Sequence, residues 1–140
     1  MNTKKRSVRR KGDAPILYAS PASAGFPAPG DDMVETRLSL DALLIKNPPA
    51  TFFVRASGDS MEGVHIASGD ILVVDRSIEP RSGMVAVAAV MGELVVKRLV
   101  KRGKVLLLAS ENDAYEPIVV TEEGDCVIWG VVTGVVRTLL

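Results

Sequence analysis

The chain has 140 residues, of which 47% are hydrophobic and only 4% aromatic, so we expect one domain with a core of aliphatic side chains. The formal net charge is zero, but residues 1–12 hold six bases and no acid, which leaves 11 bases against 17 acids elsewhere, a net charge of −6. Such an acidic body argues against direct sequence-specific DNA binding.

The single cysteine, Cys126, and the single histidine, His65, exclude an internal disulfide and a closed zinc site. We therefore expect no metal and no cofactor. The longest apolar run, Met84–Met91, has eight residues, which is too short to cross a membrane, and no apolar stretch follows the basic start as it would in a signal peptide. A cytoplasmic protein without a membrane anchor is expected.

Residues 1–38 are predicted to form a flexible N-terminal arm. Its basic run, Lys4–Lys11, is typical of a solvated tail. The following stretch, Ala19–Gly30, is rich in Pro, Gly, Ala and Ser, and its prolines favour an extended chain. A plain linker is one interpretation. The other is a protease substrate, because proteases bind extended peptides and Ala24 and Gly25 present an uncrowded peptide bond.

Residues 39–140 are predicted to form one mostly β domain with a short helix. Ser39 is a candidate N-cap for a helix over Leu40–Lys46. Six or seven short, Val-rich runs separated by Gly-bearing turns favour curved antiparallel sheets, with a two-residue hairpin at Met91-Gly92. The expected strands cover Thr51–Ala56, Ile71–Asp75, Met84–Val90, Glu93–Leu99, Val105–Ala109, Ile118–Val120 and Cys126–Val132.

The stretch Ser57-Gly58-Asp59-Ser60-Met61 lies between a predicted strand and a second Gly-bearing turn. A hydroxyl in such a place is often only a turn or cap residue. It is also where a fold can present a nucleophile, because Gly58 permits a sharp backbone path and the flanking elements hold the serine. The stretch alone leaves both interpretations open.

Lys97 lies within an apolar predicted strand, with Val95 and Leu99 on its own face. A lysine there either reaches solvent from an edge or is buried, and burial that lowers its pKa from about 10.4 to about 7–8 makes it a usable base. Arg98 cannot serve, because a guanidinium does not deprotonate in proteins. Alternation along the strand does not say which of the two basic residues faces inward.

These motifs together resemble the LexA-type self-cleaving peptidases (peptidase S24), and the related signal peptidases use the same Ser–Lys pairing. The resemblance rests on Ser57–Met61, on Gly69-Asp70 at the start of a strand, and on a strand lysine 37 residues after Ser60. Within the family the chain is most similar to the UmuD-like proteins, although residues 1–20 carry none of the likeness. Further motifs of that group are Ala24-Gly25-Phe26-Pro27, Phe53–Met61, Asp113–Ile118 and Gly130-Val131-Val132.

The resemblance implies curved antiparallel sheets of the LexA C-terminal-domain type, with Ser60 as nucleophile and Lys97 as general base. It implies a scissile bond between Ala24 and Gly25, and an oxyanion stabilised by the backbone N–H groups of Ser60 and Asp59. The chain departs from the family at one position, since some UmuD-like proteins have Cys before the scissile glycine where this chain has Ala24. Both residues are small, so the bond stays cleavable.

The resemblance also implies a role in the SOS response to DNA damage. The intact chain would form a homodimer, and a RecA–single-stranded-DNA filament would stimulate its self-cleavage. The processed form would then join a UmuC-like, Y-family polymerase subunit in error-prone translesion synthesis.

Three alternative functions make different demands on the sequence. A LexA-like repressor would need a DNA-reading helix-turn-helix, for which the 24 residues before the cleavage site are too few. A signal peptidase would need a membrane anchor. A non-catalytic or regulatory binding subunit of a polymerase complex, with a residual Ser–Lys site, stays open.

Overall fold

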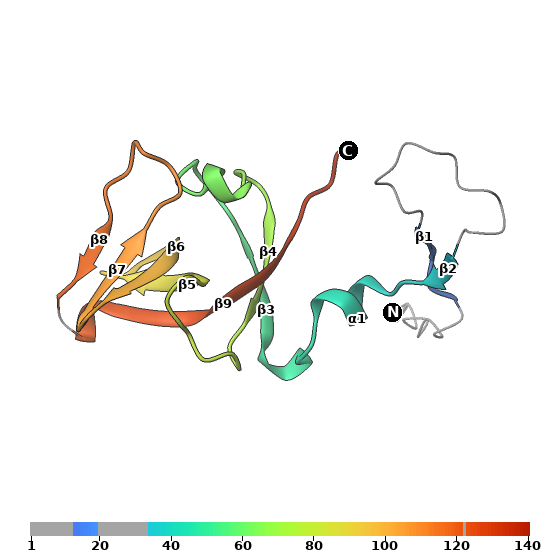
Figure 1. The fold of residues 1–140 in the computed structure, drawn as a ribbon, viewed down its shortest axis with the longest axis horizontal. Helices are drawn as coiled ribbons and strands as arrows, with labels where there is room; N and C mark the ends of the chain where they lie inside the picture. The colour runs from blue at the N-terminus through green and yellow to red at the C-terminus, as the bar shows by residue number, and fades with distance from the viewer. Residues whose placement is uncertain (1–12, 20–33, 122) are drawn as a thin grey trace, which may run out of the picture. The chain divides into compact units, whose positions relative to one another are not determined.

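The computed structural model describes residues 13–19, 34–121 and 123–140, and its contacts divide the chain into two units, Met1–Leu43 and Leu44–Leu140. We predicted the boundary after residue 38. Figure 1 labels the strands and the helix α1 along the chain.

In the first unit, β1 (Ile16–Ala19) pairs antiparallel with β2 (Val34–Arg37). Beyond the paired residues, the N–H of Leu38 donates to the carbonyl of Pro15 at 2.9 Å. We predicted an arm here and did not foresee either strand. Runs of four residues are too short to show a period of two, and an isolated two-stranded pair is only marginally stable.

The helix α1 (Leu40–Leu44) begins where the sequence predicted it. Ser39 Oγ accepts a hydrogen bond from the N–H of Ala42 at 3.3 Å, which is an N-cap interaction. The helix ends before Lys46, the predicted last residue, and the 3-10 turn η3 (Pro48–Ala50) follows it. Among the described residues, no helix has the length and the hydropathy that a membrane span requires.

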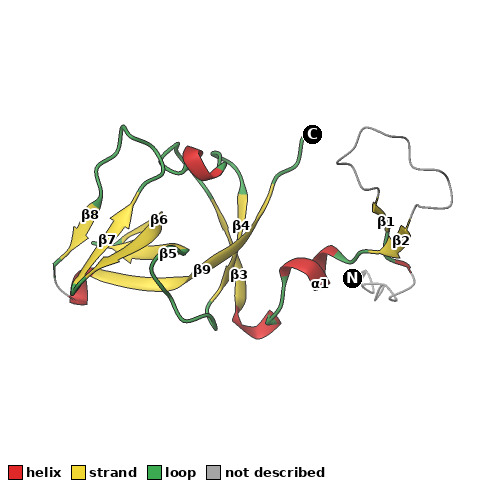
Figure 2. Ribbon diagram, in the orientation of Figure 1, coloured by secondary structure: helices red, strands yellow, loops and turns green. Residues whose placement is uncertain are grey.

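The strands of the second unit form one seven-stranded sheet in the order β3-β4-β9-β5-β6-β7-β8, and every neighbouring pair is antiparallel. Figure 2 shows strands as the dominant element of this unit, which confirms the predicted mostly β, antiparallel fold. The predicted hairpin is also confirmed, since Met91 and Gly92 link β5 to β6 with φ of 49° and 83°. The strands are β3 (Thr51–Arg55), β4 (Ile71–Asp75), β5 (Val85–Val90), β6 (Glu93–Arg102), β7 (Val105–Ala109), β8 (Ile118–Val120) and β9 (Cys126–Val136), with 3-10 turns η4 (Glu62–Val64) and η5 (Glu123–Asp125) between them.

The long strand β9 joins two parts of the sheet, because it pairs with β5 along its first part and with β4 along its second (Figure 1). The pairing register shifts between Val73 and Val74 and between Val87 and Ala88, and such irregularities bend a sheet. Gly130 stands at this bend. A Cβ atom there would lie 2.6 Å from Val74 Cγ1, so only glycine allows the strands to approach so closely.

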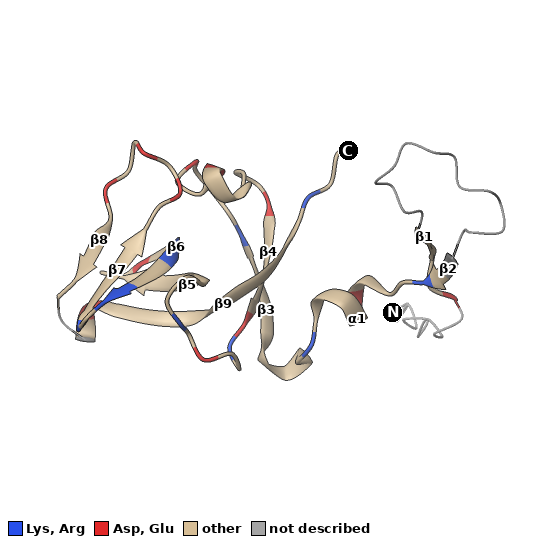
Figure 3. Cartoon of the chain, in the orientation of Figure 1, with Lys and Arg blue, Asp and Glu red and all other residues tan. Residues whose placement is uncertain are grey.

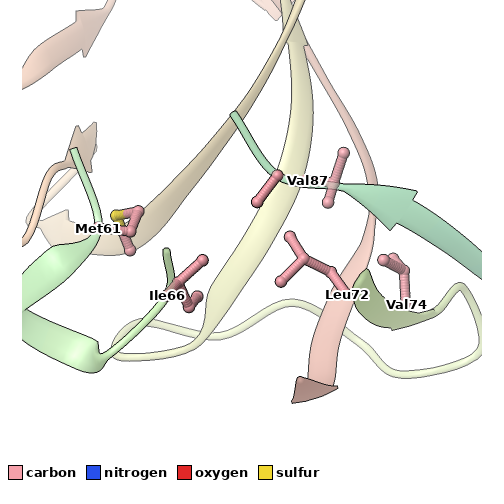
Figure 4. Packing of buried hydrophobic residues seen from close by; sticks show 6 residues of the cluster. Met61, Ile66, Leu72, Val74 and Val87 are labelled. Atoms are coloured by element: carbon pink, nitrogen blue, oxygen red, sulfur yellow. The ribbon is translucent and has the colours of Figure 1, made fainter. Parts of the chain in front are cut away.

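Among the described residues, two clusters of buried aliphatic side chains form the core, in keeping with the low aromatic content. Met61 belongs to the first cluster and is 3% exposed (Figure 4). Burying a side chain of this size contributes about 1.5–3 kcal/mol, so the packing anchors the turn that contains Ser60, the residue before it. The first cluster comprises Ala56, Met61, Ile66, Leu72, Val74 and Val87, and the second comprises Ala86, Leu99 and Leu108.

A bidentate ion pair ties the C-terminal end of the chain to the loop before β4. Arg137 Nε and Nη2 donate to the two carboxylate oxygens of Asp70 at 2.7 and 2.6 Å, and Nη2 also donates to the carbonyl of His65 at 3.0 Å. Asp70 is 2% exposed and accepts a further bond from the N–H of Ala67. The bond from Arg137, and after it the bond from Ala67, lowers the pKa of Asp70 to about 2.

We predict that Asp70→Asn lowers the thermal unfolding midpoint at neutral pH, because Arg137 then loses its charged partner. The contribution of Asp70 should be complete above its unfolded pKa of about 3.9 and should disappear as the pH falls through about 2, so the two melting curves should converge in acid. Thermal melts across this range test the prediction. Asp113→Asn, at an exposed aspartate, is the matched control, and an equal loss in both variants at every pH would contradict the prediction.

Candidate active site

The stretch Ser57–Met61 forms a tight turn between β3 and η4. Gly58 has a φ of 82°, in the left-handed region that favours glycine. Before the turn, Ala56 exchanges two backbone hydrogen bonds with the Gly69-Asp70 stretch, each 2.8 Å long. After it, Met61 is buried in the core, so the half-buried Ser60 is held from both sides.

The loop between β7 and β8 binds the same turn through its backbone and side chains. The N–H of Glu111 donates to the carbonyl of Ser60 at 2.8 Å, and Asn112 Nδ2 donates to the carbonyl of Asp59 at 3.0 Å. The hydroxyl of Tyr115 donates to the carboxylate of Asp59, and this bond raises the pKa of Tyr115. The loop therefore fixes the position of the serine backbone.

From the sequence we assigned no role to these loop residues, although Tyr115 lies in the family motif Asp113–Ile118. The sequence held one local signal, because asparagine readily forms turns with the backbone two residues further on. In the structure Asn112 Oδ1 accepts such a hydrogen bond from the N–H of Ala114 at 3.0 Å. That signal predicts a turn and says nothing of Ser60. The contact with the serine is visible only in the folded chain.

Lys97 lies on β6 and is 8% exposed. Its Nζ donates to Ser110 Oγ at 2.7 Å and lies 5.4 Å from the ring centroid of Tyr115. Within the described ranges it has no carboxylate partner. Burial lowers the pKa of Lys97 below its ordinary value, because removal from water disfavours the charged ammonium.

The structure answers which basic residue of β6 faces inward. The strand carries two Lys-Arg pairs, residues 97–98 and 101–102, which Figure 3 draws in blue. Arg98 turns to the other face, where its Nε donates to the carboxylate of Glu111 and its Nη1 to the carbonyl of Gly83 at 2.6 Å. Lys97 is left as the buried member of its pair.

Ser60 and Lys97 line one pocket of about 410 Å³. Its other polar side chains are those of Arg55 and Ser57, so the pocket brings a hydroxyl and a buried amine into one cavity. In the described ranges, no three His, Cys, Asp or Glu side chains gather as metal ligands would. The full lining is Val54, Arg55, Ala56, Ser57, Gly58, Ser60, Met61, Ile66, Val87, Leu94, Val95, Val96 and Lys97.

The backbone N–H groups of Asp59 and Ser60 donate to no other group in the part of the chain that the structure describes. Both groups therefore remain available to a ligand. Ala24 and Gly25, the predicted scissile pair, lie outside the described residues.

Comparison with known proteins identifies related chains. The family model "Peptidase S24-like" matches residues 15–133. Protein ImpA of Escherichia coli is 42% identical over 121 residues, which cover 86% of this chain and 82% of ImpA. Protein SamA of Salmonella typhimurium is 43% identical, covering 86% and 84%. The LexA repressor of Thiobacillus denitrificans is 36% identical over 134 residues, covering 95% of this chain and 66% of the repressor.

The match spans β3, with the turn that carries Ser60, and β6, with its buried Lys97, and it continues into β9. ImpA and SamA are UmuD-like proteins, which agrees with the resemblance seen in the sequence. The chain thus belongs to the peptidase S24-like family.

Proposed function

We propose that the protein is a Ser–Lys peptidase that cleaves its own chain between Ala24 and Gly25. The observation that carries the proposal is the common pocket of Ser60 and Lys97, in which the lysine is buried. A hydroxyl becomes an effective nucleophile only beside a base, and a lysine becomes that base when desolvation lowers its pKa.

In this mechanism neutral Lys97 takes the proton of Ser60 Oγ, which attacks the carbonyl carbon of Ala24. The backbone N–H groups of Ser60 and Asp59 stabilise the oxyanion. Collapse of the tetrahedral intermediate breaks the bond to Gly25, whose amine receives the proton from Lys97. Water then releases the acyl group from the serine, again with the lysine as base.

The pocket walls suit an extended peptide. One wall is the end of β3, which pairs only with β4 among the described strands. The other is the start of β6, which pairs with β7 only from Arg98 onward. An extended chain adds readily to such free strand edges. The 14 residues from Gly25 to Leu38 span up to about 45 Å, a length that permits cleavage within one chain or between two.

The proposal includes a role in SOS mutagenesis, supported by family membership and by the UmuD-like relatives ImpA and SamA. A RecA–single-stranded-DNA filament stimulates self-cleavage in the cytoplasm. The shortened chain then acts as the accessory subunit of a UmuC-like, error-prone translesion polymerase. The alternative is a regulatory subunit of such a complex whose Ser–Lys site is inactive, and it predicts no self-cleavage.

The dyad predicts a particular pH dependence. The self-cleavage rate should rise with pH and level off at the folded pKa of Lys97, below about 10.4, because only the neutral amine accepts the Ser60 proton. Lys97→Arg keeps the charge but cannot deprotonate, so it should lose at least about 10²-fold in rate at every pH. Gels of purified protein at a series of pH values measure both effects.

Lys101→Arg makes the same substitution at an exposed position of β6 and should cleave normally. A folded Lys97→Arg protein that cleaves with the wild-type profile would overturn the dyad. The regulatory subunit with an inactive site would be the remaining function only if the wild-type protein did not cleave itself at any pH.

The cleavage site predicts fragments of 24 and 116 residues, with the larger one beginning Gly-Phe-Pro. N-terminal sequencing of the products tests this, and any other start contradicts the site. Gly25→Val should block the cut, because a β-branched side chain crowds the scissile bond. Gly30→Val, the same change in the same segment, should leave cleavage intact.

We also propose a homodimer formed through an exposed strand edge or sheet face. The edge strands of the seven-stranded sheet, β3 and β8, carry exposed Phe53 (58%) and Val119 (54%). Light scattering at micromolar concentration should give the mass of two chains. Phe53→Glu and Val119→Glu form a matched pair, and loss of the dimer in only one of them identifies the edge. A monomeric wild type would contradict the proposal.

A further inference from the structure

The side-chain amine of Lys97 has a single hydrogen-bond acceptor among the described residues, and that acceptor is the hydroxyl of Ser110. Ser110 directly follows β7, and the last residue of β7, Ala109, pairs with Arg98 on β6. The register of two neighbouring strands thus brings the hydroxyl of Ser110 alongside the amine of Lys97. The Nζ–Oγ distance of 2.7 Å is that of a short hydrogen bond.

The next residue along the chain binds the other member of the dyad. The N–H of Glu111 donates to the carbonyl of Ser60 at 2.8 Å, and the carbonyl of Glu111 accepts from the N–H of Gly63 at 2.7 Å. Gly63 has no room for a Cβ, which would lie 2.6 Å from that carbonyl oxygen. The dipeptide Ser110-Glu111 therefore contacts both Lys97 and the backbone of the serine turn.

The chemistry of a lysine base makes such a contact useful. A neutral amine has two N–H groups and one lone pair, and only the lone pair can accept a proton. Rotation about the Cε–Nζ bond would spread the lone pair over several directions. An acceptor for one N–H removes that freedom, and orientation of reacting groups accounts for a large part of catalytic rates.

We propose that Ser110 is a positioning residue, whose hydroxyl orients the Lys97 amine so that its lone pair points to Ser60. This inference rests on the Ser–Lys mechanism proposed above. In this mechanism Ser110 exchanges no proton and forms no bond with the substrate, and it acts only through the lysine that it orients.

The charged and titratable groups that the described residues place around the amine have partners of their own. The ring of Tyr115 lies 5.4 Å from Nζ, and its hydroxyl is engaged by Asp59. Arg55 lines the same pocket and donates to the carbonyl of Gly69 at 2.9 Å. Arg98 and Glu111 pair with each other. Removal of the Ser110 hydroxyl therefore leaves the ammonium without a hydrogen-bond acceptor among the described side chains.

The test compares pH–rate profiles of wild type, Ser110→Ala and Ser110→Thr. In Ser110→Ala the plateau rate should fall about 10-fold to about 100-fold, because the lone pair is no longer oriented. The pH of half-maximal rate should also fall, since an acceptor stabilises the ammonium more than the amine. If the substitution only loosened the pocket and admitted water, the pH of half-maximal rate would rise instead. Ser110→Thr keeps the hydroxyl and should restore both values.

Ser68→Ala, at an exposed turn serine, is the control and should match wild type. If Ser110→Ala does not fold, Ser110→Cys keeps the size of the side chain and replaces the oxygen by a weaker acceptor, so it should show the same changes in smaller measure. A folded Ser110→Ala or Ser110→Cys with the wild-type plateau and midpoint overturns the positioning role.

A second measurement needs no cleavage. In a Ser60→Ala background, NMR titration of the lysine side chains reports the pKa of Lys97 directly, and adding Ser110→Ala should lower it. An unchanged pKa overturns the inferred contact. By contrast, a wild-type chain that does not cleave itself overturns the dyad, so failure of the proposed function and failure of this inference are separate results.

Discussion

The amine of Lys97 is buried, with one serine hydroxyl as its hydrogen-bond acceptor and no carboxylate partner among the described residues. An ammonium taken out of water without a charged partner is costly, so this environment favours the neutral amine. The surroundings agree with that constraint, because the amine binds the Ser110 hydroxyl and lies over the Tyr115 ring, while the acidic Glu111 pairs with Arg98 instead. A carboxylate beside the amine would instead favour the charged ammonium.

A second constraint concerns Ser60, which lines the same pocket as this lysine. Two sets of contacts fix the Ser60 turn, namely the packing of Met61 in the core and the hydrogen bonds from the loop after β7. That loop begins at the end of a strand paired with β6, on which Lys97 lies. The pairing of β6 with β7 therefore fixes the positions of both Lys97 and the Ser60 turn. Sites built on such paired strands keep their geometry better than sites built on free loops.

Local patterns predicted much of the fold. The Val-rich runs, the N-cap at Ser39 and the turn at Met91-Gly92 each depend on residues a few positions apart, and the structure has all three features. β1 and β2 escaped prediction, because pairing across a long intervening segment leaves no trace in runs of four residues. The bend at Gly130 also escaped, since the close approach of Val74 is a contact between distant strands.

From the order of residues alone, the antiparallel β class could be inferred, because the period of a strand is a local property. The candidates Ser60 and Lys97 came from the resemblance of their motifs to the LexA-type peptidases. The folded chain alone decided that Lys97 rather than Arg98 faces inward, because alternation defines two faces without saying which one is covered. It also brought Asn112 and Tyr115 onto Asp59, residues 53 and 56 positions away. Contacts at such separations arise only when the strands between them have paired.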